Sequence, residues 1–130
     1  MNEASARHHS SPPLDQDLAD EYARWFRCLA DGTRVRVLSV VARAGRALTV
    51  GEVVAAVEKS QSTVSRHLRI LADEGFVLAE QEGIRTLIRV DESCMTQLPA
   101  AARMIMGDPG AADGPSRRRT GSPPPRGRER

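Results

Sequence analysis

The stretch of residues 60–75, which reads SQSTVSRHLRILADEG, most constrains what this chain can fold into. At about 100° per residue, three apolar side chains fall on one side of a helix: Val64, Leu68 and Leu71. An apolar stripe of this kind must face a core. Ser60 can cap the free amides of the first turn, and Gly75 suits a left-handed helix end. The stretch therefore predicts an amphipathic helix with both ends marked in the sequence.

The opposite side of this predicted helix is polar and basic, with no acidic residue before Asp73. Short side chains at its start leave it slim enough for the major groove of DNA, where Gln and Arg can make paired hydrogen bonds to base edges. Arg69 is expected to contact phosphate, and the other polar residues to contact base edges or nearby phosphates. The predicted DNA contacts are Gln61, Ser62, Thr63, Ser65, Arg66 and Arg69. On this stretch alone, a solvated surface helix is the alternative.

Apolar residues recur at helical spacing from Leu14 onward and predict a first helix that ends near Ala30. This helix carries three of the four aromatic residues of the chain: Tyr22, Trp25 and Phe26. A terminal helix of a small domain does not need so much aromatic surface for its own core. We expect part of it to pack against a second subunit, with ordinary core packing as the alternative.

The next two predicted helices lead into the basic helix. Asp31 can cap the first of them, which runs to Gly45 with a buried side formed by Val35, Leu38 and Val41, while Arg34, Arg36 and Arg43 stay in solvent. Thr49 and Glu52 have the spacing of a capping box and open a short helix through Val57. A short connection then joins it to the basic helix. This pair predicts a helix-turn-helix.

Two β-rich runs, 76–81 and 84–90, flank Glu82-Gly83 and predict a hairpin with a two-residue loop, the wing. Arg85 follows the turn, where it could reach a phosphate or the minor groove or simply remain solvated. Asp91 can cap a last helix, which should be interrupted at Pro99. We expect the first and last helices to pair in a homodimer. The predicted fold is mainly α with a small β-hairpin (α+β), a winged helix-turn-helix that is dimeric through its terminal helices.

Composition divides the chain into a folded domain, 14–106, between two disordered tails, 1–13 and 107–130. Residues 15–106 hold 12 Arg and Lys against 13 Asp and Glu, whereas residues 117–130 hold 6 Arg against one Glu. Binding to nucleic acid must therefore come from a local patch or from the basic tail. No segment resembles a signal peptide or a membrane span, so we expect a cytoplasmic protein.

The order of these elements, with the phrases LADGTR at 29–34 and SQSTVSRHLRIL at 60–71, resembles the ArsR/SmtB family of bacterial winged-helix repressors over residues 18–106. Gly32 departs from the family, which usually has Pro there. The resemblance implies a homodimer that needs no cofactor, binds a pseudo-palindromic double-stranded DNA operator near its own gene, and is released by an inducer.

In the arsenite-responsive type a Cys-x-Cys stands where this chain has Thr49 and Gly51, so that thiol pair is absent. No His follows His67, which removes the ligands of the zinc-responsive type.

Cys28 and Cys94 remain, one at the end of the first helix and one at the start of the last. They fit neither a disulfide framework nor a CxxC zinc pattern. The segment from Cys94 to Pro99 is similar to a Cys-x-x-Cys-x-Pro stretch in one branch of the family, with Gln97 in place of the second Cys. Our hypothesis is an As(III) or other thiophilic inducer, held by Cys94 with Cys28 of either chain. The two alternatives are plain buried cysteines and a thiol redox switch.

Other function classes have less support. The sequence contains no Gly-rich phosphate loop and no nucleophile elbow, so an enzyme is not expected. A winged helix that binds only protein partners is the serious alternative, because the fold alone does not imply DNA binding. The uninterrupted polar and basic side of the 60–75 helix argues against it.

Overall fold

The computed structural model describes residues 12–108, so most of the two predicted tails, 1–13 and 107–130, lies outside the described residues. The elements are α2 (Gln16–Cys28), α3 (Gly32–Arg43), β1 (Leu48–Thr49), α4 (Val50–Val57), α5 (Gln61–Asp73), β2 (Val77–Glu82), β3 (Arg85–Val90) and α6 (Ser93–Ile105). The predicted mainly α fold with a helix-turn-helix, formed by α4 and α5, and a wing, formed by β2 and β3, is confirmed.

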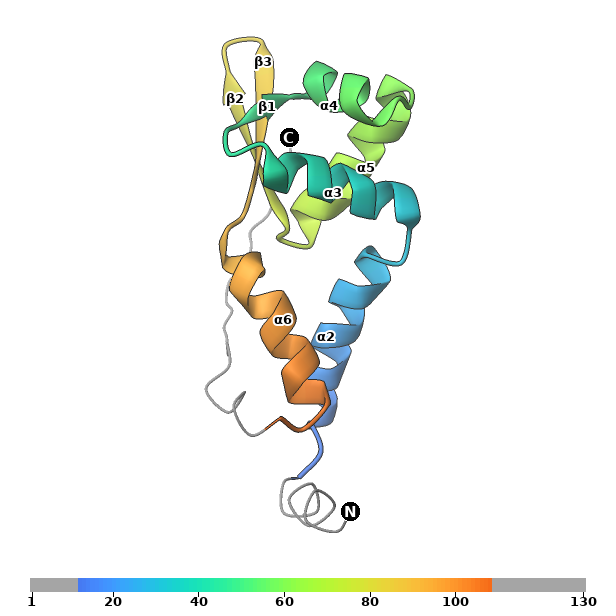
Figure 1. Ribbon diagram of the computed structural model, residues 1–130, viewed down its shortest axis with the longest axis vertical. Helices are drawn as coiled ribbons and strands as arrows, with labels where there is room; N and C mark the ends of the chain where they lie inside the picture. Colours follow the sequence, from blue (N-terminus) through green and yellow to red (C-terminus); the bar gives the residue numbers. More distant parts are fainter. Residues whose placement is uncertain (1–11, 109–130) are drawn as a thin grey trace.

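The molecule has two ends (Figure 1). The helices α3, α4 and α5 and the small sheet form the body at one end, where the tip of the β2–β3 hairpin also lies. The helices α2 and α6 leave this body and come together at the opposite end of the molecule. The first and last helices are therefore set apart from the helix-turn-helix and the wing.

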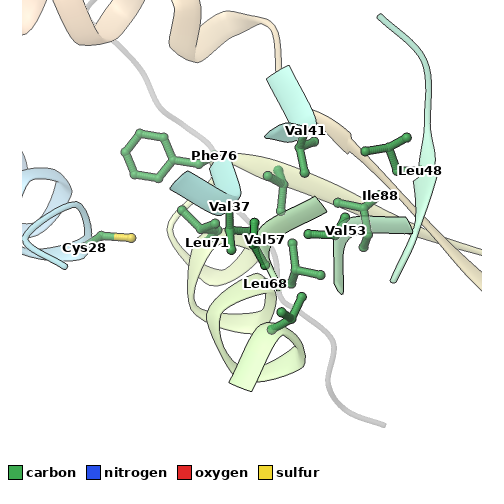
Figure 2. Packing of buried hydrophobic residues seen from close by; sticks show 12 residues of the cluster. Cys28, Val37, Val41, Leu48, Val53, Val57, Leu68, Leu71, Phe76 and Ile88 are labelled. Carbon is green, nitrogen blue, oxygen red and sulfur yellow. The ribbon is translucent and has the colours of Figure 1, made fainter. Parts of the chain in front are cut away.

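The core lies where α3, α4, α5 and the sheet meet. It is formed by buried apolar side chains, which include Val64. Figure 2 shows others of them converging: Val37, Val41, Val53, Val57, Leu68, Leu71 and Ile88. The predicted stripe of α5 is thus buried, as expected. At the end of α5, Gly75 has φ +85, and the N–H of Phe76 donates to the carbonyl of Leu71 at 2.9 Å. This is the predicted left-handed helix end, and the buried ring of Phe76 closes the core beside it.

The buried side of α3 differs from the prediction. Val35 is 46% exposed, and Val37 takes its place with Val41 in the core. The segment is apolar at several phases, so its periodicity alone could not decide which side is buried. Arg34, expected in solvent, is half-buried and contacts two other helices.

The sheet has three strands, in the order β1-β3-β2, where only the hairpin was predicted. Two residues form β1, with Leu48 opposite Ile88 and Thr49 opposite Leu87. The hairpin turn is Gly83-Ile84, one residue later than predicted, because Glu82 pairs with Arg85 and Gly83 takes the positive φ of +65.

The predicted interruption of the last helix at Pro99 is wrong, because α6 runs without a break from Ser93 to Ile105. Proline in a helix removes one backbone donor, here the one that would serve the carbonyl of Met95. Both residues are exposed, so water can take the place of that donor.

Candidate nucleic-acid interface

Ser60 sets the start of α5. Its hydroxyl oxygen accepts a hydrogen bond from the backbone N–H of Thr63 at 3.1 Å and its hydroxyl donates to Thr63 Oγ1 at 2.9 Å. Ser62 Oγ lies 3.3 Å from Ser60 Oγ. The Ser60 side chain provides an acceptor for a free backbone amide of the first turn, and these short side chains stay close to the backbone. The N-terminal end of α5 is therefore narrow, as entry into a major groove requires.

The polar side of α5 is available to a partner. Gln61, Ser62, Arg66 and Arg69 are exposed, and Thr63 and Ser65 are half-buried. Within residues 12–108, neither Arg66 nor Arg69 has its guanidinium in a hydrogen bond or an ion pair. Unpaired guanidinium groups on an exposed helix side are free to bind phosphates or base edges without first losing a partner.

In the part of the chain that the structure describes, the arginines of the wing, unlike Arg66 and Arg69 of α5, are paired with carboxylates. Arg85 donates to Glu82 at 2.8 Å, and Arg89 donates to Glu80 at 3.2 Å. Both wing arginines are therefore compensated by a neighbouring carboxylate. Arg85 lies at the expected position beside the turn, but a phosphate would have to displace Glu82 to bind it.

A polar cluster lies behind α5, formed by buried His67 with half-buried Asp31 and Arg34, and the sequence pattern indicated the inward position of His67 but not its partners. His67 is 4% exposed, and its Nδ1 accepts a hydrogen bond from Arg34 Nε at 3.3 Å. The same guanidinium donates from Nη1 to the backbone carbonyl of Cys28 at 2.8 Å. The carboxylate of Asp31 caps α3 through the N–H of Arg34 at 3.0 Å, and its Oδ1 is 4.0 Å from His67 Nε2. The sequence signal for this cluster was His67 itself, a polar residue beside the apolar stripe.

The cluster fixes the protonation states of its members. Burial lowers the pKa of His67 below its ordinary value, and Arg34 and Arg66 act in the same direction, whereas Asp31 opposes them. The hydrogen bond from the backbone of Arg34 lowers the pKa of Asp31. At neutral pH, His67 is therefore neutral, with Nδ1 free to accept, and Asp31 is ionised.

The two cysteines are free thiols in a shared apolar environment. Cys28 is 5% exposed and belongs to the core, and Cys94 packs against that core with its thiol 3.8 Å from the carbonyl of Phe76. Figure 2 shows Cys28 directed from α2 towards the core. Burial raises the pKa of both thiols to about 11. Among the residues that the structure describes, no three His, Cys, Asp or Glu side chains gather in a way that could hold a metal ion.

Across residues 12–108, no helix has both the length and the apolar character needed to cross a membrane.

Comparison with known proteins identifies the family. A model of the bacterial regulatory protein arsR family matches residues 31–78, which include the helix-turn-helix. The chain is 38% identical over 93 residues to a probable mercury resistance operon repressor of Streptomyces lividans, covering 72% of this chain and 73% of the relative. It is 43% identical over 58 residues to the arsenic resistance transcriptional regulator ArsR1 of Pseudomonas putida, covering 45% of this chain and 44% of the relative.

Among solved structures, the chain is similar to the homodimeric winged helix-turn-helix DNA-binding domain of Mb0332 from Mycobacterium bovis. The identity is 27%, the TM-score is 0.54, and the match covers 79% of this chain and 90% of that domain. The fold, the exposed basic side of α5 and these relatives agree. The chain therefore belongs to the arsR family of bacterial regulatory proteins and is a DNA-binding transcriptional regulator.

Proposed function

We propose that this regulator is an autoregulatory repressor that binds a pseudo-palindromic operator as a homodimer and is released by a thiophilic inducer. The observation that carries operator binding is the side of α5 on which Arg66 and Arg69 are exposed and have no ion-pair partner among the residues that the structure describes. A buried stripe on the opposite side holds that helix against the core and leaves this side exposed to a partner.

The roles within the interface follow from position along α5. Gln61, Ser62 and Thr63 lie in the first turn, the part of a recognition helix that contacts base edges. Ser65 and Arg66, one turn further, contact base edges or nearby phosphates, and Arg69 contacts phosphate. Arg85 supplies a phosphate or minor-groove contact from the wing once Glu82 releases it.

The dimer forms through α2 and α6. Large apolar side chains are exposed on these two helices and just beyond them: Phe26, Met95, Ile105 and Met106. Ile105 and Met106 also line a hollow of about 250 Å³ between the segment before α2 and the C-terminal end of α6. Large apolar side chains that are left exposed on two terminal helices favour a protein contact. The Mycobacterium bovis domain is homodimeric, which supports a dimer, and the exposed side chains are our reason for placing its interface on α2 and α6.

The inducer is As(III), Hg(II) or another soft thiophilic species bound through Cys94 with Cys28 of the same or the partner chain. Soft ions prefer thiolate ligands, and no described cluster of three harder ligands competes for them. The names of two relatives, a probable mercury resistance repressor and an arsenic resistance regulator, support this class of inducer.

The same thiols are poorly suited to a redox switch. Peroxide reacts with the thiolate, and burial raises the pKa of Cys28 and Cys94 to about 11, so little thiolate is present at neutral pH. A thiophilic ion can instead displace the thiol proton as it binds. We therefore place oxidative release second.

Fluorescence anisotropy of the reduced protein on labelled duplex from upstream of its own gene, with excess random duplex, tests the proposal. We expect tight binding that arsenite or mercuric chloride reverses and that zinc chloride does not. Cys28→Ser and Cys94→Ser should keep operator binding and lose release. Release that survives both substitutions would remove the cysteine site. If the duplex is not bound specifically, the operator assignment fails and the interaction-module alternative gains weight.

A further inference from the structure

One side chain connects three helices behind the DNA-facing side of α5. Arg34, in the first turn of α3, donates from Nε to His67 Nδ1 on α5 at 3.3 Å and from Nη1 to the carbonyl of Cys28 at the end of α2 at 2.8 Å. Asp31 holds the backbone of Arg34 at 3.0 Å and lies 4.0 Å from His67 Nε2. We call Asp31, Arg34 and His67 the Arg34 bridge.

The bridge constrains α5 in a way that apolar packing does not. An apolar stripe resists the withdrawal of a helix from its core, but it is tolerant of small rotations about the helix axis. A hydrogen bond to a particular ring nitrogen is directional, and it weakens steeply when donor and acceptor turn away from each other. His67 is 4% exposed and cannot replace this bond with bulk water. The bridge therefore favours one rotation of α5.

We propose that Arg34 is a positioning residue for operator recognition, which fixes the rotation of α5 and so directs Arg66 towards the DNA. Arg66 is the direct neighbour of His67 in the chain, and it is exposed where His67 is buried. Two of the donor nitrogens of Arg34 are occupied inside the protein. Arg34 therefore acts through His67 and does not itself bind the DNA. This inference rests on the proposed reading of an operator by α5.

Protonation of His67 supplies a readout that ordinary structural support would not give. A protonated imidazole has no acceptor at Nδ1 and would place a cation beside the Arg34 guanidinium. The charged groups that face His67 are Asp31 and Arg34 from α3, and Arg66 from α5 itself. From α2 the bridge meets the backbone carbonyl of Cys28, which carries no charge. Burial is the main reason why the neutral ring is favoured; Asp31 opposes it, and Arg34 and Arg66 act with burial, so acid should open the bridge.

The test measures binding of the full chain to labelled operator duplex and to random duplex between pH 5.5 and 8, at several salt concentrations. The wild-type preference for operator over random duplex should fall as pH drops below about 6.5, the ordinary pKa of histidine. Arg34→Gln should weaken operator binding by about tenfold, the scale of one lost charge-assisted hydrogen bond, and leave random-duplex affinity unchanged. Its salt dependence should also stay unchanged, because Arg34 neutralises no phosphate.

Two further variants make the result specific. His67→Gln keeps a neutral acceptor that does not titrate, so it should bind the operator within about threefold of wild type at pH 7.5 and show no pH dependence. Arg43→Gln removes the same charge from α3 but disturbs only a contact to Ser39 within that helix, so it should behave as wild type.

Three outcomes would overturn the inference: equal loss on both duplexes for Arg34→Gln, a reduced salt dependence in that variant, or a pH profile that persists in His67→Gln. If Arg34→Gln does not fold, the pH profiles of wild type and His67→Gln still test whether the Arg34 bridge positions α5. A wild-type protein with no preference for the operator would instead contradict the proposed function.

Discussion

Arg66 and Arg69 lie one turn apart on the exposed side of α5, yet we expect different consequences when each is removed. Arg66→Ala should weaken operator binding by about 1–3 kcal/mol and relax the preference for operator sequence, because we propose that Arg66 contacts base edges. Arg69→Ala should weaken binding to all sequences alike and reduce the salt slope by about one, because a phosphate contact carries no sequence information. Anisotropy titrations on operator and random duplex at three or more salt concentrations separate the two. If both variants lose the same factor on both duplexes, the division of roles is wrong.

His67 also predicts how stability depends on pH. Its pKa is lowered in the folded protein, chiefly by burial, so the unfolded chain takes up the proton first as pH falls. The contribution of His67 is fully present above its ordinary pKa of about 6.5 and is lost as pH falls towards the folded value. The urea midpoint should therefore drop between pH 7.5 and pH 5.5. The same change in His67→Gln would show that another group is responsible. Asp31 and Glu52, whose pKa values are also lowered, act only at more acidic pH.

At the scale of elements, two glycines give a matched pair. Gly75 ends α5 with φ +85, and a Cβ there would meet nothing within 4 Å, so Gly75→Ala isolates the cost of the left-handed backbone. We expect a loss of about 1 kcal/mol in the free energy of unfolding. Gly51 lies inside α4, and a Cβ there would make an ordinary contact at 3.9 Å with Thr49 Oγ1. Gly51→Ala should stabilise by about 0.5–1 kcal/mol. Urea titrations of both variants test the opposite signs.

Four helix ends were predictable because their signals are local, whereas the N-cap of α6 is Glu92 and not Asp91, the predicted cap. Ser60, Asp31 and Thr49 each cap the helix that follows, and Gly75 ends α5, as their side chains and spacing indicated. The hydrogen bonds at these helix ends join residues three to five positions apart, so both partners lie close together in the sequence. The exposure of Gln61, Ser62, Arg66 and Arg69 followed from the same helical periodicity, and their role as DNA contacts stays a prediction.

Features that depend on distant partners were not predictable in this way. The strand β1 is two residues long and exists only because β3 pairs with it. Arg34 reads as a surface arginine until the fold brings His67, 33 residues away, within hydrogen-bonding distance. The predicted turn of the wing is one residue too early. From the sequence, Glu82 could belong to the turn or to the strand, and its pairing with Arg85 in the sheet places it in the strand. In each case a tertiary contact outweighed the local pattern.

At the scale of the whole molecule, the two ends carry different elements, and we propose DNA binding for one end and dimer contact for the other. The helix-turn-helix and the wing tip lie at one end, and α2 and α6 lie at the other, with exposed apolar side chains on and just after them (Figure 1). A dimer formed through α2 and α6 would leave both copies of α5 free to occupy the two halves of one operator. The second half-site is then bound at a high effective concentration, which makes a dimer far stronger on its operator than a single protomer.

Ile105→Glu tests this assembly. Ile105 is half-exposed at the end of α6, and a carboxylate there would be desolvated in a dimer but not in a monomer. We expect a monomer by sedimentation velocity and an operator affinity lowered about 100-fold or more, with little change on random duplex per protomer. Ile84→Glu is the matched control for assembly, because Ile84 is 99% exposed at the wing tip and should leave the dimer intact. A persistent Ile105→Glu dimer would place the interface elsewhere. If the variant is monomeric but its operator affinity is unchanged, one protomer reads the site alone and the pseudo-palindromic operator is wrong.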